Sequence, residues 1–370
     1  MADAPMVGIL GGGQLGRMLA EAARALGVRT KVLDPSEHAS AGRVTTHILG
    51  DYTSERALAA LAEGCDVVTY EFENVPVEAA ERIAETVPVH PTPEALRVAQ
   101  DRLNERKVFG ELGIASPTSV AVDAEHRIDS ALSRVGEPAL LKARRLGYDG
   151  KGQFLISGAH DIPDAWRAIA GAPAILDAFV GFERELSVVG VRAADGACRF
   201  YPLAQNVHRG GILRVTTAPA PNVPDALRQN AEAAARAIME RLGYVGVLAV
   251  EFFQIGSDGD ARLVANEIAP RVHNTGHWTI EGAPASQFEN HIRAVLGMDL
   301  GETAPAVPSA MVNAIGELPE ASRVSAVPGA VLHDYQKAPR PGRKVGHVTI
   351  TAPTPAELRE RLERYTRVVG

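Results

Sequence analysis

The first hundred residues alternate short apolar runs with amphipathic stretches, and this alternation restricts the possible fold more than any other feature of the chain. The run MVGIL (6–10) reads as a strand, residues 11–13 as a glycine turn, and QLGRMLAEAARALG (14–27) as a helix that ends at its last glycine. The same pattern continues with the strands TKVLD (30–34) and DVVTYE (66–71) and the helices SERALAALAEG (54–64) and PVEAAERIAE (76–85). Such a series predicts a parallel sheet covered by helices.

The pattern changes twice further along the chain. Thr92 and Pro93 are typical of a helix start and mark a domain junction. Residues 138–270 read as strands and hairpins that carry one helix, at 225–243, so this region is predicted to be α+β. A proline-containing linker at 301–310 precedes three strands and a last helix. We therefore expect a parallel α/β domain over 1–100, a central domain over 101–300 and a small β-rich domain over 301–370.

Composition limits the partners of the chain. The net charge of −7 and the absence of a long basic run disfavour a nucleic-acid groove or an anionic membrane surface. No apolar run approaches the roughly twenty residues of a membrane span, and MVGIL lacks the flank of a signal peptide. Cys65 and Cys198 have no metal-type spacing, which favours inert buried thiols in a reducing compartment. We expect a cytoplasmic protein that binds neither nucleic acid nor membrane.

The first glycine cluster raises an alternative. Gly11, Gly13 and Gly16 fit the GxGxxG pattern between a strand and a helix, and Asp34 lies where a ribose-binding carboxylate is expected. This pattern allows an NAD-dependent dehydrogenase. Tight strand-to-helix turns also need glycine, however, and a helix N-terminus can bind another phosphate. Nothing further along the chain supplies a hydride-transfer site.

A second motif lies in the central region. The strands VGVLAVEFF and ARLVANEIA flank the turn SDGD, which predicts a hairpin. A three-residue loop centred on Gly259 would place Glu251 opposite Glu267. Opposed carboxylates repel unless a proton or cation lies between them, and oxygen ligands without nearby cysteine favour Mg²⁺. Asn266 could add a ligand or a hydrogen bond, while a slipped register would leave a solvated face instead.

The segment KARRLGYDGKGQ (142–153) joins two apolar runs that read as strands. A glycine loop with Lys151 at its tip and Lys142 on the preceding strand can bind a polyphosphate with its Mg²⁺. It lacks GxxxxGK[ST], so it is not a P-loop. Taken alone, GYDGKGQ could also be a surface turn.

These motifs together resemble a known family. The order GILGGGQLGRM, YEFENVP, GYDGKGQ, ERELSVV, NVHRGGIL, NEIAPRVHNTGHW and RPGRKVGHVTI is similar to 5-(carboxyamino)imidazole ribonucleotide synthases, the ATP-grasp carboxylases of purine biosynthesis, along nearly the whole chain. The resemblance implies an ATP-grasp architecture and an ATP- and bicarbonate-dependent carboxylation of 5-aminoimidazole ribonucleotide. An ATP-grasp ligase acting on another ribonucleotide stays as an alternative. We also expect a homodimer.

The resemblance also implies residue roles. Mg²⁺ would lie on Glu251 and Glu267, and ATP would contact Arg102, Lys142, Gly147, Tyr148, Asp149, Gly150, Lys151, Gly152, Gln153, Asp177, Ala178, Phe179, Val180, Glu185, His208, Asn266 and Glu267. The second substrate would contact Gln14, Leu15, Glu73, Tyr148, Arg271, His273, Asn274, Arg343 and Lys344. Asp149, Arg271 and Lys344 are the expected catalytic residues, with Asp149 placed to move a proton and Arg271 to present a planar fork of donors to phosphate.

Overall fold

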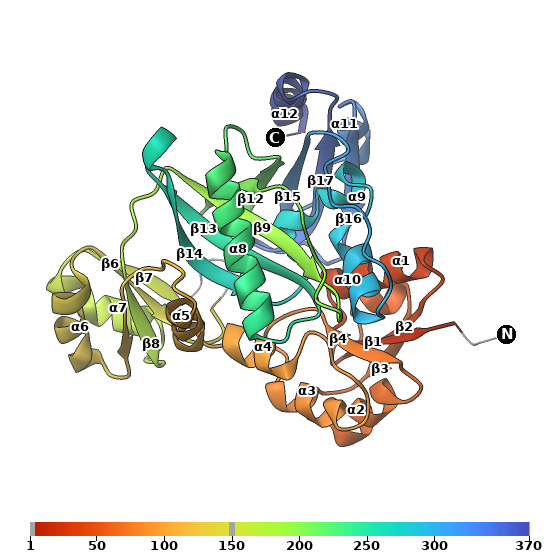
Figure 1. The fold of residues 1–370 in the computed structure, drawn as a ribbon, viewed down its shortest axis with the longest axis horizontal. Coiled ribbons are helices and arrows are strands. Elements are labelled where there is room, and N and C mark those ends of the chain that lie inside the picture. The colour runs from red at the N-terminus through yellow and green to blue at the C-terminus, as the bar shows by residue number, and fades with distance from the viewer. Residues whose placement is uncertain (1–3, 148–151, 370) are drawn as a thin grey trace.

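The protein is described by a computed structural model, which covers residues 4–147 and 152–369. Three sheets organise these residues: a parallel sheet near the N-terminus, a small antiparallel sheet, and a large sheet that carries the C-terminal strands (Figure 1).

The N-terminal sheet has the strand order β3-β2-β1-β4, with every pair parallel. Its elements are β1 (Met6–Leu10), α1 (Gln14–Ala25), β2 (Arg29–Asp34), β3 (Thr46–Leu49), α2 (Glu55–Ala62), β4 (Val67–Tyr70) and α3 (Val77–Ala84). The predicted alternation is confirmed, except that β3 was missed. This strand is short, lies at the sheet edge and is at most half-buried, so no apolar run marks it.

Two helices lead from this sheet to the next. Helix α4 (Pro93–Ala99) begins as predicted, because the Thr92 hydroxyl accepts a hydrogen bond from the amide of Ala95 at 3.3 Å and proline occupies the first turn. Helix α5 (Arg102–Glu111) is capped in the same way by Asp101, which accepts from the amide of Leu103.

The small antiparallel sheet has the order β5-β8-β6-β7. It consists of β5 (Ser119–Val122), α6 (Ile128–Val135), β6 (Ala139–Ala143), β7 (Gln153–Ile156), α7 (Ile162–Ala168) and β8 (Ala174–Ala178). The prediction of a single helix within 138–270 was wrong, because α7 lies there as well. That helix is seven residues long, carries a proline in its first turn and has one buried residue, Ala165, so its periodicity is weak.

The large sheet has nine strands in the order β14-β13-β9-β11-β12-β15-β17-β16, with β10 paired to β9. These strands are β9 (Arg184–Arg192), β10 (Cys198–Phe200), β11 (Ala204–Arg209), β12 (Ile212–Ala218), β13 (Gly246–Ile255), β14 (Arg262–Ala269), β15 (Ser309–Ile315), β16 (Ala330–Asp334) and β17 (Lys344–Thr351). The helices of this part are α8 (Asp225–Arg241), α9 (Thr279–Gly282), α10 (Gln287–Val295), α11 (Ala321–Ser325) and α12 (Pro355–Val369). Because β12 pairs with β15, the sheet continues unbroken into the C-terminal residues.

One core joins the N-terminal sheet to the large sheet. Leu15 and Leu19 of α1 are buried in the same cluster as Phe288 and Ile292 of α10. Helix α10 in turn packs on β13 and β9. This packing brings the N-terminus of α1 close to the strands that carry the predicted site residues.

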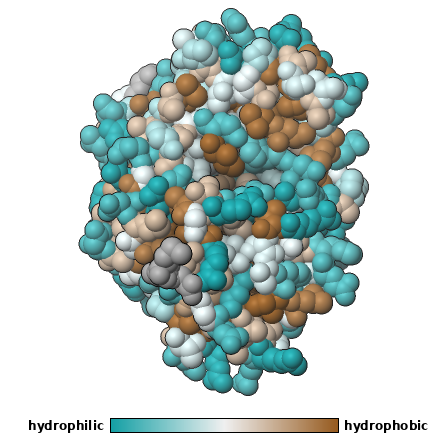
Figure 2. All heavy atoms as spheres, turned by 90° about the vertical axis from the view of Figure 1, so that its right-hand side faces the viewer, coloured by the Kyte–Doolittle hydropathy of each residue, from teal (hydrophilic) through white to brown (hydrophobic). Residues whose placement is uncertain are grey.

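The outer surface is mixed in character. On the face seen in Figure 2, hydrophilic residues dominate and hydrophobic ones form small separate groups. Within residues 4–147 and 152–369, no helix has the length and apolar character needed to cross a bilayer. Cys65 and Cys198 are both free thiols and are only half-buried, less than predicted.

Candidate functional site

Two adjoining cavities contain most of the predicted site residues. The smaller, of about 240 Å³, lies between the small sheet and the large sheet, and Lys142, Glu185 and Glu251 are among its walls. The larger, of about 920 Å³, extends to the N-terminus of α1 and to residues 340–344 near β17. The residues common to both walls are Arg102, Glu267, His273, Asn274 and Lys344.

The predicted carboxylate pair is present. Glu251 on β13 is paired with Glu267 on β14. The connecting loop is longer than the three residues expected, since β13 ends at Ile255 and β14 begins at Arg262. Near the turn the strand pairing is shifted by one residue from the expected register, since Phe252 pairs with Ala265. Asn266 is the extra residue of a β-bulge, and this bulge restores the predicted pairing.

The electrostatics of this pair favour a cation. Burial, followed by the charge of Glu267, raises the pKa of Glu251 to about 7. Arg102 donates through Nη1 to Oε2 of Glu267 at 3.3 Å, which leaves the Glu251 side of the pair to other partners. On that side, Nε2 of His273 lies 3.8 Å from Oε1 of Glu251.

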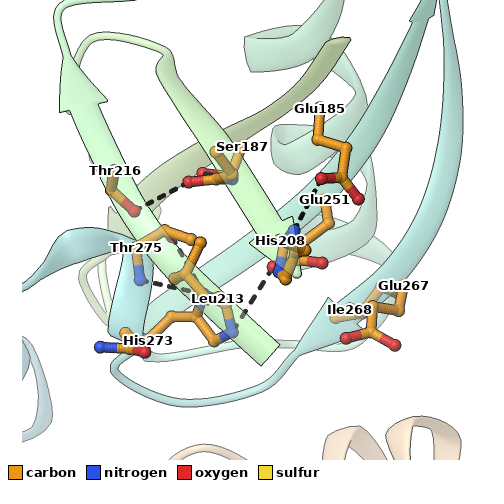
Figure 3. Close-up of polar contacts among 12 residues, drawn as sticks. Glu185, Ser187, His208, Leu213, Thr216, Glu251, Glu267, Ile268, His273 and Thr275 are labelled. Carbon is orange, nitrogen blue, oxygen red and sulfur yellow. Dashed lines mark hydrogen bonds and ion pairs between the residues drawn. The ribbon is translucent and has the colours of Figure 1, made fainter. Parts of the chain in front are cut away.

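Two histidines lie beside these carboxylates (Figure 3). His208 on β11 contacts Oε2 of Glu185 on β9 through Nδ1 at 2.7 Å. Burial opposes the charged form of His208, but this hydrogen bond and the charge of Glu251 raise its pKa. Burial, together with the charges of Arg271 and Lys344, holds the pKa of His273 well below its usual value. The surroundings of the two histidines thus shift their pKa values in opposite directions.

Lys142 and Asp177 form a buried ion pair beneath the smaller cavity. Nζ of Lys142 lies 3.0 Å from Oδ2 of Asp177. Burial lowers the pKa of Lys142. Burial alone would raise the pKa of Asp177, but the charges of Lys142 and Arg106 lower this pKa to about 2. The ammonium group is therefore oriented by a carboxylate that stays ionised.

The predicted hinge follows this carboxylate. Asp177 and Ala178 end β8, while Phe179 and Val180 lead toward β9. The amide of Phe179 donates to the carbonyl of Pro138 at 3.2 Å. Among the residues described, these four are not part of either cavity wall.

Apolar side chains also line the smaller cavity. Phe182 and Phe253 stack with ring centroids 4.7 Å apart and an interplanar angle of 14°. Leu140 and Leu213 are further apolar residues of the cavity lining. Sequence reasoning missed both aromatic residues, although Phe182 in AFVGFERE and Phe253 in VEFFQI are visible in the sequence close to the predicted site residues Glu185 and Glu251.

In the larger cavity, the predicted substrate residues Glu73 and Arg271 contact each other. Nε of Arg271 donates to Oε2 of Glu73, and Nη1 of Arg271 donates to the carbonyl of Val272 at 3.0 Å. Burial works against ionisation of Glu73, but the charge and the hydrogen bond of Arg271, together with weaker contributions, outweigh it and lower the pKa of Glu73. The pair therefore stays charged and leaves part of the guanidinium facing the cavity.

Asn274 is held by a reciprocal amide pair. Its Nδ2 donates to Oδ1 of Asn313 at 3.1 Å, and Nδ2 of Asn313 donates back to Oδ1 of Asn274 at 2.7 Å. Nδ2 of Asn313 also donates to the carbonyl of Leu213. A residue of the C-terminal strand β15 thus orients a residue between the two cavities, and sequence reasoning missed Asn313.

The backbone amides at the N-terminus of α1 bind a carboxylate from elsewhere in the same chain. Glu71 accepts from the amide of Gly13 at 2.6 Å and from the amide of Gly16 at 2.8 Å. The amide of Gly12 donates to Asp34 at 2.8 Å, and the hydroxyl of Tyr52 also donates to Asp34. The glycine turn and the supposed ribose carboxylate are therefore occupied by internal contacts, which removes the basis of the dinucleotide alternative.

The remaining predicted residues lie on the walls of the larger cavity. Gln14, Leu15, Arg343 and Lys344 are all there. Oε1 of Gln14 accepts from Nζ of Lys337, a residue that sequence reasoning missed. Lys337 comes from the HDYQK segment, whose lysine was a signal that went unused.

The glycine loop is described at its two ends. Gly147 lies on the wall of the larger cavity and Gln153 on that of the smaller. The carbonyl of Gly152 accepts from the amide of Ala143 at 2.8 Å, so β6 and β7 form the predicted hairpin. Tyr148, Asp149, Gly150 and Lys151 lie outside the described residues.

Comparison with known proteins identifies the family. The chain matches the ribonucleotide synthetase preATP-grasp domain over residues 5–100, the ATP-grasp domain over 107–288 and the phosphoribosylaminoimidazole carboxylase C-terminal domain over 309–361. It is 48% identical to N5-carboxyaminoimidazole ribonucleotide synthase of Pseudomonas aeruginosa, across 98% of this chain and 99% of that protein. The chain belongs to the N5-carboxyaminoimidazole ribonucleotide synthase family.

Solved structures of the same family have the same fold. The synthetase from Thermus thermophilus aligns with a TM-score of 0.93 at 53% identity and 99% coverage of both chains. The Aspergillus clavatus synthase in complex with ADP and 5-aminoimidazole ribonucleotide aligns with a TM-score of 0.92 at 34% identity, over 100% of this chain and 99% of that one. The predicted ATP-grasp architecture and the resemblance on which it rested are confirmed.

Proposed function

We propose that this protein uses ATP and bicarbonate to carboxylate the amine of 5-aminoimidazole ribonucleotide, forming 5-(carboxyamino)imidazole ribonucleotide in purine biosynthesis. The observation that carries the proposal is the shared wall of Arg102, Glu267, His273, Asn274 and Lys344 between the two cavities. A phosphoryl group leaving the smaller cavity would meet a second substrate in the larger one. The complex of the Aspergillus relative with ADP and 5-aminoimidazole ribonucleotide supports this pair of ligands.

The smaller cavity is the proposed ATP site. Phe182 and Phe253 offer stacking surface for adenine, and Glu185 can accept hydrogen bonds from ribose hydroxyls. Lys142, Arg102 and Gln153 line this cavity and would contact phosphate oxygens, and we expect the glycine loop of 147–153 to contribute further contacts. His208 and Asn266 are on the wall of this cavity and would border the nucleotide, whereas the hinge of 177–180 lies outside that wall.

The opposed carboxylates fit a magnesium ion. Among the described residues, no cluster of three or more His, Cys, Asp or Glu side chains has the arrangement of a metal site. Mg²⁺ usually takes only one or two carboxylates and completes its shell with phosphate oxygens and water. Burial and the charge of Glu267 raise the pKa of Glu251, so a cation between the two carboxylates would favour its ionised form. These two residues would hold Mg²⁺, which supplies charge neutralisation on the transferring phosphate.

The larger cavity is the proposed site of the ribonucleotide. Four amides at the start of a helix lack intrahelical partners, and Glu71 occupies those of Gly13 and Gly16. The amides of Gln14 and Leu15 are thereby left to bind a phosphate, with Lys337 nearby. Glu73 would accept from the heterocycle, while Asn274, His273 and Arg343 would border it.

The chemistry would take place at the shared wall. Bicarbonate attacks the γ-phosphate to give carboxyphosphate, which breaks down to carbon dioxide and phosphate, and the exocyclic amine then attacks carbon dioxide. Arg271 can present N–H donors to carboxyphosphate, Lys344 contributes positive charge, and Asp149 would move the proton from the amine. We further propose three domains over 1–100, 101–300 and 301–370, a homodimer, and a cytoplasmic location.

Phosphate release with each substrate omitted in turn tests the function. We expect release that depends on ATP, Mg²⁺, bicarbonate and 5-aminoimidazole ribonucleotide together, with a carboxylated product that carries label from ¹⁴C-bicarbonate. Release supported equally by another ribonucleotide amine would instead assign the chain to a different acceptor. Failure of all these amines to stimulate release would reject the proposal.

A further inference from the structure

One turn of α5 contacts three consecutive residues of β14. Arg102 donates to Oε2 of Glu267 at 3.3 Å, and Arg106 donates through Nη1 to the carbonyl of Asn266 at 2.8 Å. Glu105 accepts from the amide of Ile268 at 2.5 Å. Positions 102, 105 and 106 share one helix face. This turn therefore holds the bulge that turns Glu267 toward Glu251.

Arg106 has a second partner on another sheet. Its Nη2 donates to Oδ2 of Asp177 at 3.0 Å, and the same oxygen lies 3.0 Å from Nζ of Lys142. The side chain of Arg106 is 6% exposed and that of Asp177 is 2% exposed, so water does not screen these contacts. One guanidinium therefore connects the strand of Glu267 in the large sheet with the strands of Asp177 and Lys142 in the small sheet.

Arg106 does not border either cavity in the part of the chain that the structure describes. It can act on ligands through Asn266, Asp177 and Lys142, and also through Glu105, whose Oε2 accepts from Nη1 of Arg106 at 3.2 Å. A planar guanidinium places two N–H groups toward two acceptors at once, whereas a lysine ammonium is a single point charge on a flexible stem. The double contact thus fixes one sheet relative to the other more firmly than a lysine could.

We propose that Arg106 is a positioning residue, which sets the placement of Lys142 relative to Glu267. It thereby aligns the lysine that would donate to phosphate with the carboxylate that would hold the metal. The inference rests on the proposed function for the roles of those two residues. Loss of an outer partner of a metal ligand typically lowers metal affinity or activity by about 10–100-fold. Arg106 is expected to act on that scale.

The test compares Arg106→Lys and Arg106→Gln with the wild-type protein. Phosphate release is measured while Mg²⁺, ATP and 5-aminoimidazole ribonucleotide are varied one at a time. For Arg106→Lys we expect the half-saturating Mg²⁺ concentration to rise and kcat to fall, each about tenfold or more, with the KM for the ribonucleotide changed by less than about twofold. Arg106→Gln loses the charge beside Asp177 as well and should show the larger effect.

Arg192→Lys is the matched control. Arg192 on β9 also donates to a backbone carbonyl, that of Tyr244 at 2.8 Å, but it lies outside both cavity walls. This variant should keep the wild-type Mg²⁺ dependence. If Arg106→Lys lowers Tm but leaves the Mg²⁺ dependence and kcat of the folded enzyme unchanged, its role is structural only and the inference is overturned.

Calorimetric titration of ATP at several Mg²⁺ concentrations separates this inference from the proposed function. The titration needs no acceptor, so it gives a result even if the wild-type protein fails to carboxylate 5-aminoimidazole ribonucleotide. A Mg²⁺-dependent weakening of ATP binding in Arg106→Lys supports the inference. If ATP binding depends on Mg²⁺ equally in the wild-type protein and in Arg106→Lys, the inference is rejected, whether or not the proposed function holds. If Arg106→Gln is insoluble, Arg106→Lys alone decides between these results.

Discussion

Glu71→Gln is expected to destabilise the start of α1 severely. The carboxylate of Glu71 accepts two hydrogen bonds, one from Gly13 through Oε1 and one from Gly16 through Oε2. Both partners are backbone amides, and the residue is 6% exposed. A glutamine can accept only one of the two bonds, and its NH₂ group would then face the other amide, donor against donor.

The expected size follows from these two contacts. Losing one hydrogen bond to a charged acceptor costs about 1.5–3 kcal/mol, and a buried donor left without a partner costs about 1–3 kcal/mol more. The sum is about 2.5–6 kcal/mol. Because 1 kcal/mol moves the Tm of a 150–250-residue unit by about 2–4 °C, we expect Tm to fall by about 5–10 °C in this larger chain.

Differential scanning calorimetry at neutral pH measures this change, and Glu21→Gln is the matched control. Glu21 lies on the same helix and pairs with Arg17 at 3.0 Å in an i,i+4 contact at the surface. Such pairs contribute about 0.3–0.5 kcal/mol, so Tm of the control should move by roughly 1 °C. Equal Tm shifts in the two variants would refute the claim that Glu71 satisfies both amides.

Three further predictions concern the site. Glu267→Gln should lower kcat at least about a hundredfold, because the metal that neutralises the phosphate charge loses a ligand, while the circular dichroism spectrum stays unchanged. Near-normal turnover would contradict the metal role. Phe182→Ala should raise the ATP KM about fivefold or more, because base–aromatic stacking contributes about 1–3 kcal/mol. The KM for the ribonucleotide should stay unchanged, and an unaltered ATP KM would place adenine elsewhere. Burial favours the neutral form of Glu73, but the charge and the hydrogen bond of Arg271, together with weaker contributions, outweigh it and keep the pKa of Glu73 below its ordinary 4.5. The stabilisation by this ion pair is therefore present above pH 4.5 and lost as the pH falls through the lower folded-state value. The Tm difference between wild type and Glu73→Gln, measured by thermal melts, should therefore be largest near neutral pH and shrink in acid, and a constant difference would argue against the ion pair.

Local patterns were sufficient for the elements with strong periodicity. The strand MVGIL and the helix after it formed as predicted, because the apolar spacing and the glycine turn are both local. Elements with weak patterns were missed, as β3 and α7 show. The Glu251–Glu267 pair is intermediate. The pairing was right, but the loop was longer than expected and a bulge at Asn266 compensated, which spacing alone cannot reveal.

The sequence by itself determined the chemical groups of the site and, through motif order, the family. Only the tertiary structure decided which of those groups meet. Lys337 reaches Gln14 across 323 residues of chain, and Arg271 reaches Glu73 across 198. Arg106 joins two sheets through partners 160 and 71 residues away. Periodicity reports which face of an element is buried, whereas contacts between distant elements depend on how the sheets pack, and a single sequence carries no local signal of that packing.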